Sequence, residues 1–172
     1  MLKKLLFLLL PIIGFSQNVI LSDNAKVSIL TCGTAPVSYA MYGHTGIRIT
    51  DNVNQLDVVY NYGAFDFTTP NFIMKFVKGD LQYFVTSENY YDFEYNYKLD
   101  GRSIVSQELN LTTAQKQKLL NELNSSLTSE ERFYTYKFID KNCTTMVVDK
   151  INKILGEEIL KQPKSDQTYR EI

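Results

Sequence analysis

A polar turn followed by a cysteine-led helix is the feature that most constrains how this sequence can fold. Alternation over residues 133–138 predicts a strand, and polar residues up to Asn142 end it. Cys143 then opens a segment that ends at Gly156, and apolar residues recur through it at helical spacing: Val147, Val148, Ile151, Ile154 and Leu155. A thiol at a helix N-terminus lies at the positive end of the helix dipole, which favours its anion. Cys143 is therefore a candidate nucleophile.

The single histidine of the chain, His44, begins a second informative segment. Apolar and polar residues alternate from His44 to Thr50, which predicts a strand, and Gly43 and Gly46 leave room around the ring. An imidazole can take the proton of a thiol and return it. We predict that His44 and Cys143 meet in the fold as base and nucleophile. A structural histidine and a small buried cysteine are the alternatives that the residues leave open.

A cysteine–histidine pair needs a third group that orients the imidazole. The sequence offers several polar residues for this role and does not choose between them: Tyr42, Asp57, Asn61 and Asp66. The backbone N–H of Cys143, together with the side-chain amide of Asn142, is the expected stabiliser of an oxyanion.

The first sixteen residues predict the compartment. Lys3 and Lys4 precede a short apolar run over residues 5–13, and Gly14-Phe15-Ser16 supplies the small-x-small pattern that precedes a cleavage site, before Gln17. This layout is typical of a cleaved signal peptide over residues 1–16, so we expect an exported, periplasmic chain. No transmembrane segment is expected in the mature chain over residues 17–172.

Composition excludes several classes of function. The chain has 18 Lys and Arg against 19 Asp and Glu, without a basic block, so no nucleic-acid partner is expected. One histidine and two distant cysteines do not form a zinc site of ordinary spacing, and no phosphate or dinucleotide motif is present. We therefore predict neither metal nor cofactor. A Cys32–Cys143 disulfide in a non-catalytic exported module remains an alternative.

The remaining pattern predicts one α+β domain, in which an antiparallel sheet packs against the cysteine-bearing helix. A proline-started helix is expected after Thr69, and a capping box at Thr112 starts a further helix through Leu127. Residues 88–99 fit a helix or a strand. The other strands are expected at residues 26–31, 56–62, 81–86 and 102–111.

Short motifs follow one another in an order that resembles the N-terminal periplasmic domain of the Lnb family, found widely in Bacteroidetes. They are SILTCG at 28–33, YGHTGIR at 42–48, YNYGAFDF at 60–67, KFVKG at 75–79, GR at 101–102, QELNLT at 107–112 and DKNC at 140–143. Together they cover nearly all of the mature chain.

This resemblance implies a thiol acyltransferase of lipoprotein N-acylation, in which a fatty acyl chain moves from a lipid donor to the N-terminal cysteine amine of a lipoprotein. It also implies a permuted papain-like (NlpC/P60-like) fold, in which the histidine strand precedes the cysteine helix. His44 matches the family histidine, Cys143 the family cysteine, and Cys32 a recurrent cysteine without an assigned role.

The partners that the resemblance implies are a lipid acyl donor and a lipoprotein acceptor, with peripheral membrane contact. An NlpC/P60-like hydrolase of cell-wall peptides is the alternative. Full-length Lnb proteins continue into a C-terminal membrane region, so we expect that this chain is a truncated or stand-alone version, or that the membrane part lies elsewhere.

Overall fold

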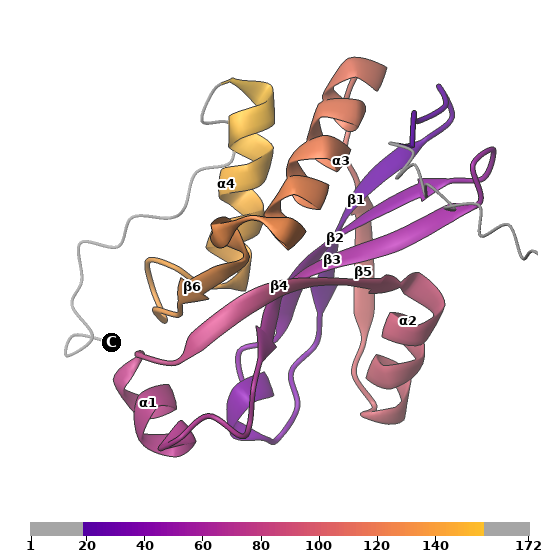
Figure 1. The fold of residues 1–172 in the computed structure, drawn as a ribbon. Helices are drawn as coiled ribbons and strands as arrows, with labels where there is room; N and C mark the ends of the chain where they lie inside the picture. The colour runs from indigo at the N-terminus through magenta and orange to yellow at the C-terminus, as the bar shows by residue number, and fades with distance from the viewer. Residues whose placement is uncertain (1–18, 157–172) are drawn as a thin grey trace, which may run out of the picture.

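The computed structural model describes residues 19–156, and the predicted signal peptide lies outside them. Within the described residues a six-stranded antiparallel sheet, in the order β5-β1-β2-β3-β4-β6, is combined with four α-helices (Figure 1). This confirms the α+β prediction. The elements in chain order are β1 (Lys26–Cys32), η1 (Ser38–Ala40), β2 (His44–Asp51), β3 (Leu56–Phe65), α1 (Phe72–Lys78), β4 (Gln82–Asn89), α2 (Tyr90–Leu99), β5 (Ile104–Glu108), α3 (Thr113–Thr128), η2 (Glu130–Arg132), β6 (Phe133–Thr135) and α4 (Cys143–Leu155).

The sheet has two apolar faces because side chains alternate along each strand. The larger core contains Ile47 and Tyr62 from the strands, Leu119 from α3 and Ile151 from α4. The smaller core, on the face covered by α2, is built from Leu30, Cys32, Val59 and Phe93. Figure 1 shows α3 and α4 next to each other on one side of the sheet, and α2 on the other. The cysteine helix is thus anchored against the centre of the sheet.

Two of the predicted helix starts are confirmed in detail. Thr112 and Gln115 form the capping box of α3. Asn142 and Thr145 form a second capping box at the start of α4, where the Asn142 side chain accepts from the Thr145 N–H at 3.0 Å. Each box satisfies backbone donors that have no partner within the helix. Cys143 is consequently held as the first residue of α4.

A buried ion pair joins α4 to α3. Lys150 is 8% exposed and donates to Glu122 at 2.7 Å. Burial lowers the pKa of Lys150, but hydrogen bonds to Glu122 and Glu131 and the nearby charges more than offset it, so the pKa is raised. The ammonium therefore stays charged at neutral pH and fixes how the two helices sit against each other.

Several boundaries differ from the predictions. β3 continues to Phe65, beyond the end expected at Tyr62, because its irregular pairing with β4 resumes after Asn61 and joins Phe65 to Tyr83. β6 stops at Thr135, and the following residues instead form a turn closed by a bridge between Lys137 and Lys141.

The start of α1 was also predicted wrongly. It begins at Phe72 rather than at Pro70, and its N-terminal neighbour Asn71 has a left-handed backbone, φ 59°, without a side-chain cap. Gly79 ends this helix with a left-handed backbone, φ 66°. The ambiguous residues 88–99 are divided between the end of β4 and α2. β5 covers Ile104–Glu108, shorter than predicted.

The packing of α4 against the sheet predicts how core substitutions change the free energy of unfolding. Ile151 is 2% exposed, so Ile151→Ala leaves a cavity and should lower the free energy of unfolding by about 3 kcal/mol, measured by urea denaturation. Val53 is 67% exposed, and Val53→Ala should change it by less than about 0.5 kcal/mol. Equal losses in both variants would contradict this packing.

Candidate active site

The start of β2 and the first turn of α4 meet at one edge of the larger core. The Thr45 hydroxyl hydrogen-bonds the Thr144 hydroxyl at 2.8 Å, although the residues are 99 positions apart. Each threonine is the direct neighbour of a predicted reactive residue, His44 or Cys143. The bond therefore holds the predicted base and the predicted nucleophile at the same place.

The surroundings of Cys143 favour its thiolate. Burial by itself raises the pKa of the Cys143 thiol. A hydrogen bond from His44 and its charge, the backbone N–H of Thr45 and the hydroxyl of Thr144 outweigh that effect and lower the pKa from 9.0 to about 7. A substantial fraction of the thiol is ionised at neutral pH as a result, which is the form that acts as a nucleophile. The structure thus brings the two predicted residues into direct interaction.

Gly63 provides the space that the imidazole occupies. A Cβ atom at this position would lie 2.4 Å from Cε1 of His44 and 2.9 Å from its Nδ1. Asn61 keeps this part of β3 in place, because its Oδ1 accepts the Gly63 N–H at 2.7 Å. Any larger residue at position 63 would displace the ring from its present position.

Glu88 is a second polar residue, after Asn61, that lies close to His44. The pKa of its carboxyl is raised chiefly by burial and also by the charge of Asp92, while a hydrogen bond from Asn61 and the charge of His44 lower it in part. An asparagine donates only through its amide nitrogen, so Asn61 donates to Glu88 while its oxygen holds Gly63. Asn61 and Glu88 are therefore the polar groups that border His44 on the α2 face.

Asn61 was among the predicted orienting residues, and Glu88 was missed. The sequence signal for Glu88 is weak, because its position depends on the pairing of Val59 with Glu88 between β3 and β4. Pairing of this kind is set by the tertiary register.

The structure places the other predicted orienting groups elsewhere. Asp66 accepts hydrogen bonds from the N–H and the hydroxyl of Thr68, at 2.8 and 2.7 Å. Asp57 binds the guanidinium of Arg48 with both oxygens at 2.8 Å. Tyr42 is exposed, and its ring contacts Phe138. Their side chains are engaged with these neighbours rather than with the imidazole.

The Asn142 amide is likewise occupied. Its oxygen caps α4, and its nitrogen donates to the carbonyl of Phe138 at 3.0 Å. The prediction that this amide stabilises an oxyanion is therefore not supported by its geometry. The first backbone N–H groups of α4 have no acceptor within the helix, so they are the better donors for that task.

Cys32 is a free, buried cysteine at the end of β1, and in the sheet it pairs with His44 of β2. Burial raises its pKa to about 11, although a hydrogen bond with Tyr97 and the charge of Arg102 act in the other direction. Cys143 is also free, so the structure does not contain the Cys32–Cys143 disulfide of the alternative hypothesis.

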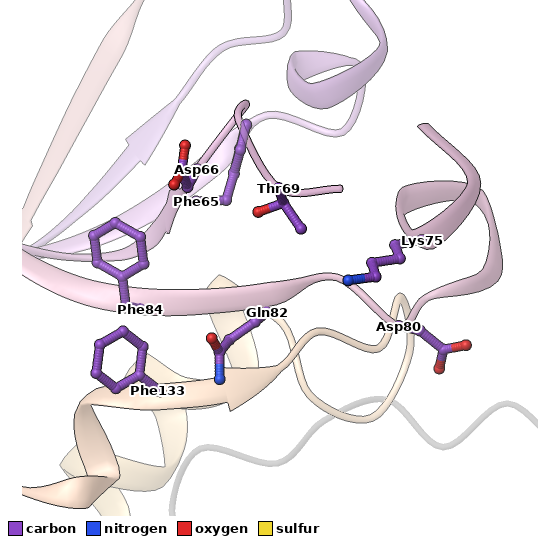
Figure 2. Close-up of a pocket in the computed structure, with 8 residues that line it drawn as sticks. All are labelled: Phe65, Asp66, Thr69, Lys75, Asp80, Gln82, Phe84 and Phe133. Carbon is purple, nitrogen blue, oxygen red and sulfur yellow. The ribbon is translucent and has the colours of Figure 1, made fainter. Parts of the chain in front are cut away.

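A separate cavity of about 490 Å³ opens between α1, β4 and β6 (Figure 2). In Figure 2 Lys75 extends from α1 toward this space, and the rings of Phe84 and Phe133 lie next to each other. Neither His44 nor Cys143 lines it. The lining residues are Phe65, Asp66, Thr69, Lys75, Asp80, Gln82, Phe84 and Phe133.

Comparison with protein-family models shows the family of the chain. Residues 16–172 match the model of the Lnb N-terminal periplasmic domain. The chain belongs to this family. Searches of curated proteins and of solved structures found no match to this chain. The permuted papain-like relationship therefore stays a prediction, whereas the family itself agrees with the predicted periplasmic location.

Two further findings concern the described part of the Lnb domain. Within residues 19–156 no helix is long and apolar enough to cross a membrane. Over the same range, no three His, Cys, Asp or Glu residues are grouped as metal ligands.

The first prediction for the site concerns the ionisation of Cys143. Alkylation of the native Lnb domain by iodoacetamide should rise with pH around a midpoint near 7, because the thiolate is the reacting form. His44→Asn removes the charge of the imidazole and its hydrogen bond. We expect the midpoint to move up toward 9.0 and the rate at pH 7 to fall at least about tenfold, measured by mass spectrometry. An unchanged midpoint in this variant would show that His44 does not activate the thiol.

The second prediction tests whether Glu88, which lies close to His44, affects the ionisation of Cys143. The charge of His44 acts on the Glu88 carboxyl, and His44 also contacts the Cys143 thiol, so the loss of the Glu88 charge should reach the thiol through the imidazole. Glu88→Gln should therefore raise the alkylation midpoint, by less than His44→Asn does. Asp66→Asn is the matched control and should leave the midpoint in place, since Asp66 binds Thr68 instead. Equal effects of the two substitutions would exclude a positioning role for Glu88.

Proposed function

We propose that this Lnb domain is a cysteine acyltransferase, which moves a fatty acyl group from a lipid donor to the N-terminal amine of a lipoprotein. The observation that carries the proposal is the lowered pKa of Cys143, which arises from its contact with His44 at the start of α4. A partly ionised thiol next to an imidazole is the arrangement that forms acyl-thioester intermediates.

In the first half of the reaction, the Cys143 thiolate attacks the ester carbonyl of the lipid donor. Backbone N–H groups at the start of α4 stabilise the oxyanion that forms. The bond from the acyl carbon to the ester oxygen then breaks, and the imidazolium of His44 gives its proton to the departing lipid alcohol. The products are a thioester on Cys143, a lysolipid and a neutral imidazole.

In the second half, the amine of the lipoprotein attacks the thioester. His44 takes the proton that the amine loses, the bond from the acyl carbon to sulfur breaks, and Cys143 leaves as the thiolate beside a protonated imidazole. An amide is formed and the starting state is restored without a further reactant.

The test uses phospholipid with labelled acyl chains and a diacylated lipopeptide whose N-terminal cysteine amine is free. Wild-type protein should yield the triacylated product by mass spectrometry. Cys143→Ala should abolish it, and His44→Ala should slow it by about 10²- to 10⁴-fold because the proton transfers are lost. Cys32→Ala, which removes a thiol with a raised pKa, is the matched cysteine control and should retain transfer.

Unchanged transfer in the Cys143 or His44 variant would refute the proposal. Release of peptide fragments from peptidoglycan without any acyl transfer would instead favour the cell-wall hydrolase.

A further inference from the structure

The helix α1 presents aliphatic side chains to solvent instead of to the core. None of its residues is buried. Ile73, Met74 and Val77 are 67%, 58% and 69% exposed, so this short helix holds an apolar face that no described residue covers. Exposed aliphatic side chains that cluster on one helix mark a surface for interaction rather than for folding.

A series of ring contacts connects α1 to the residues next to the thiol. Phe72 of α1 contacts Phe67 at 5.1 Å and Phe76 at 6.3 Å, between ring centroids. Phe76 contacts Phe138 at 5.7 Å, and Phe138 contacts Tyr42 at 6.3 Å. Aromatic packing of this kind gives α1 a fixed position relative to the loops that lead into β2 and α4.

The last two rings of this series, Tyr42 and Phe138, adjoin the candidate active site. Tyr42 lies two residues before His44, and the carbonyl of Phe138 accepts a hydrogen bond from the Asn142 cap of α4. Figure 1 shows α1 and η1 at the end of the sheet where α4 begins. We define the apolar rim as the exposed residues of this region: Tyr42, Phe67, Ile73, Met74, Val77 and Ile139.

Charge distinguishes the possible occupants of the apolar rim. α1 carries Lys75 and Lys78 and has no acidic residue, and neither lysine forms an ion pair within residues 19–156. The neighbouring Asp80 is paired with Lys137 at 3.1 Å. A helix with exposed aliphatics and unpaired lysines fits the interface of an anionic bilayer, where lysines reach the phosphates while the apolar face enters the acyl region.

We infer that the apolar rim, with Lys75 and Lys78, docks the protein on the surface of an anionic phospholipid bilayer. Docking here would place the end of the domain that carries Cys143 next to the membrane, where an acyl ester is present at high local concentration. The purpose of the surface rests on the proposed function, whereas the surface itself rests on the exposure, ring contacts and charges given above.

The experiment measures flotation of the exported, processed protein with vesicles of phosphatidylglycerol and phosphatidylethanolamine. Ile73→Asn combined with Val77→Asn should weaken binding at least about tenfold, because two aliphatic side chains no longer enter the bilayer. Val53→Asn is the matched control, since Val53 has the same 67% exposure as Ile73 but lies in the β2–β3 turn, and it should bind as wild type. Lys75→Gln combined with Lys78→Gln should remove the preference for phosphatidylglycerol over phosphatidylcholine vesicles.

The outcomes separate this inference from the proposed chemistry. Cys143→Ala should bind vesicles as wild type does, so a loss of acyl transfer leaves the docking surface testable. Thermal unfolding of each variant checks that the fold is intact. Absence of wild-type flotation, or equal weakening by Val53→Asn, would overturn the inference. A wild-type dimer that Ile73→Asn with Val77→Asn converts to a monomer would overturn it as well, because a second copy would then cover the rim.

Discussion

The arrangement of the site depends on the packing of α4 against the sheet. Ile47 of β2 and Ile151 of α4 share the larger core, and the Thr45–Thr144 hydrogen bond locks the adjoining ends of the two elements. The Asn142 capping box sets where the helix begins, so it also sets where the thiol lies. A small rotation of α4 on the core would separate Cys143 from the imidazole, which is why an apolar core contact and a chemical contact are linked here.

The two cysteines, one in β1 and one at the start of α4, show how the same side chain acquires opposite properties in one fold. Cys32 is buried and Cys143 is partly buried, and burial disfavours a thiolate. At Cys32 this effect prevails and the pKa rises to about 11. At Cys143 the imidazole, a backbone N–H and a hydroxyl prevail, and the pKa falls to about 7. The balance between burial and the donors directed at the sulfur, rather than residue type, therefore decides which of the two cysteines has the lowered pKa.

The two faces of the sheet contribute different side chains to the surroundings of His44. The α4 face carries Cys143, and the α2 face carries Asn61 and Glu88 next to the ring. Between them, the irregularity in β3 and the missing side chain at Gly63 leave the space that the imidazole fills. The proposed docking surface, the apolar rim, lies beyond this edge, where the ring of Tyr42 contacts that of Phe138.

Local pattern in the sequence was sufficient to identify β2, the start of α3 and α4. The strand at His44, the capping box at Thr112 and the helix from Cys143 to Gly156 depend on residues within one or two turns, so periodicity and caps identify them. Tertiary structure alone decided that Asn61 and Glu88, instead of Asp66, border the ring. It also decided that the side-chain oxygen of Asn142 caps its own helix and that Ile73 and Val77 are exposed to solvent. These outcomes depend on strand register and on which partners arrive from distant segments, and such contacts leave no periodic trace in a single chain.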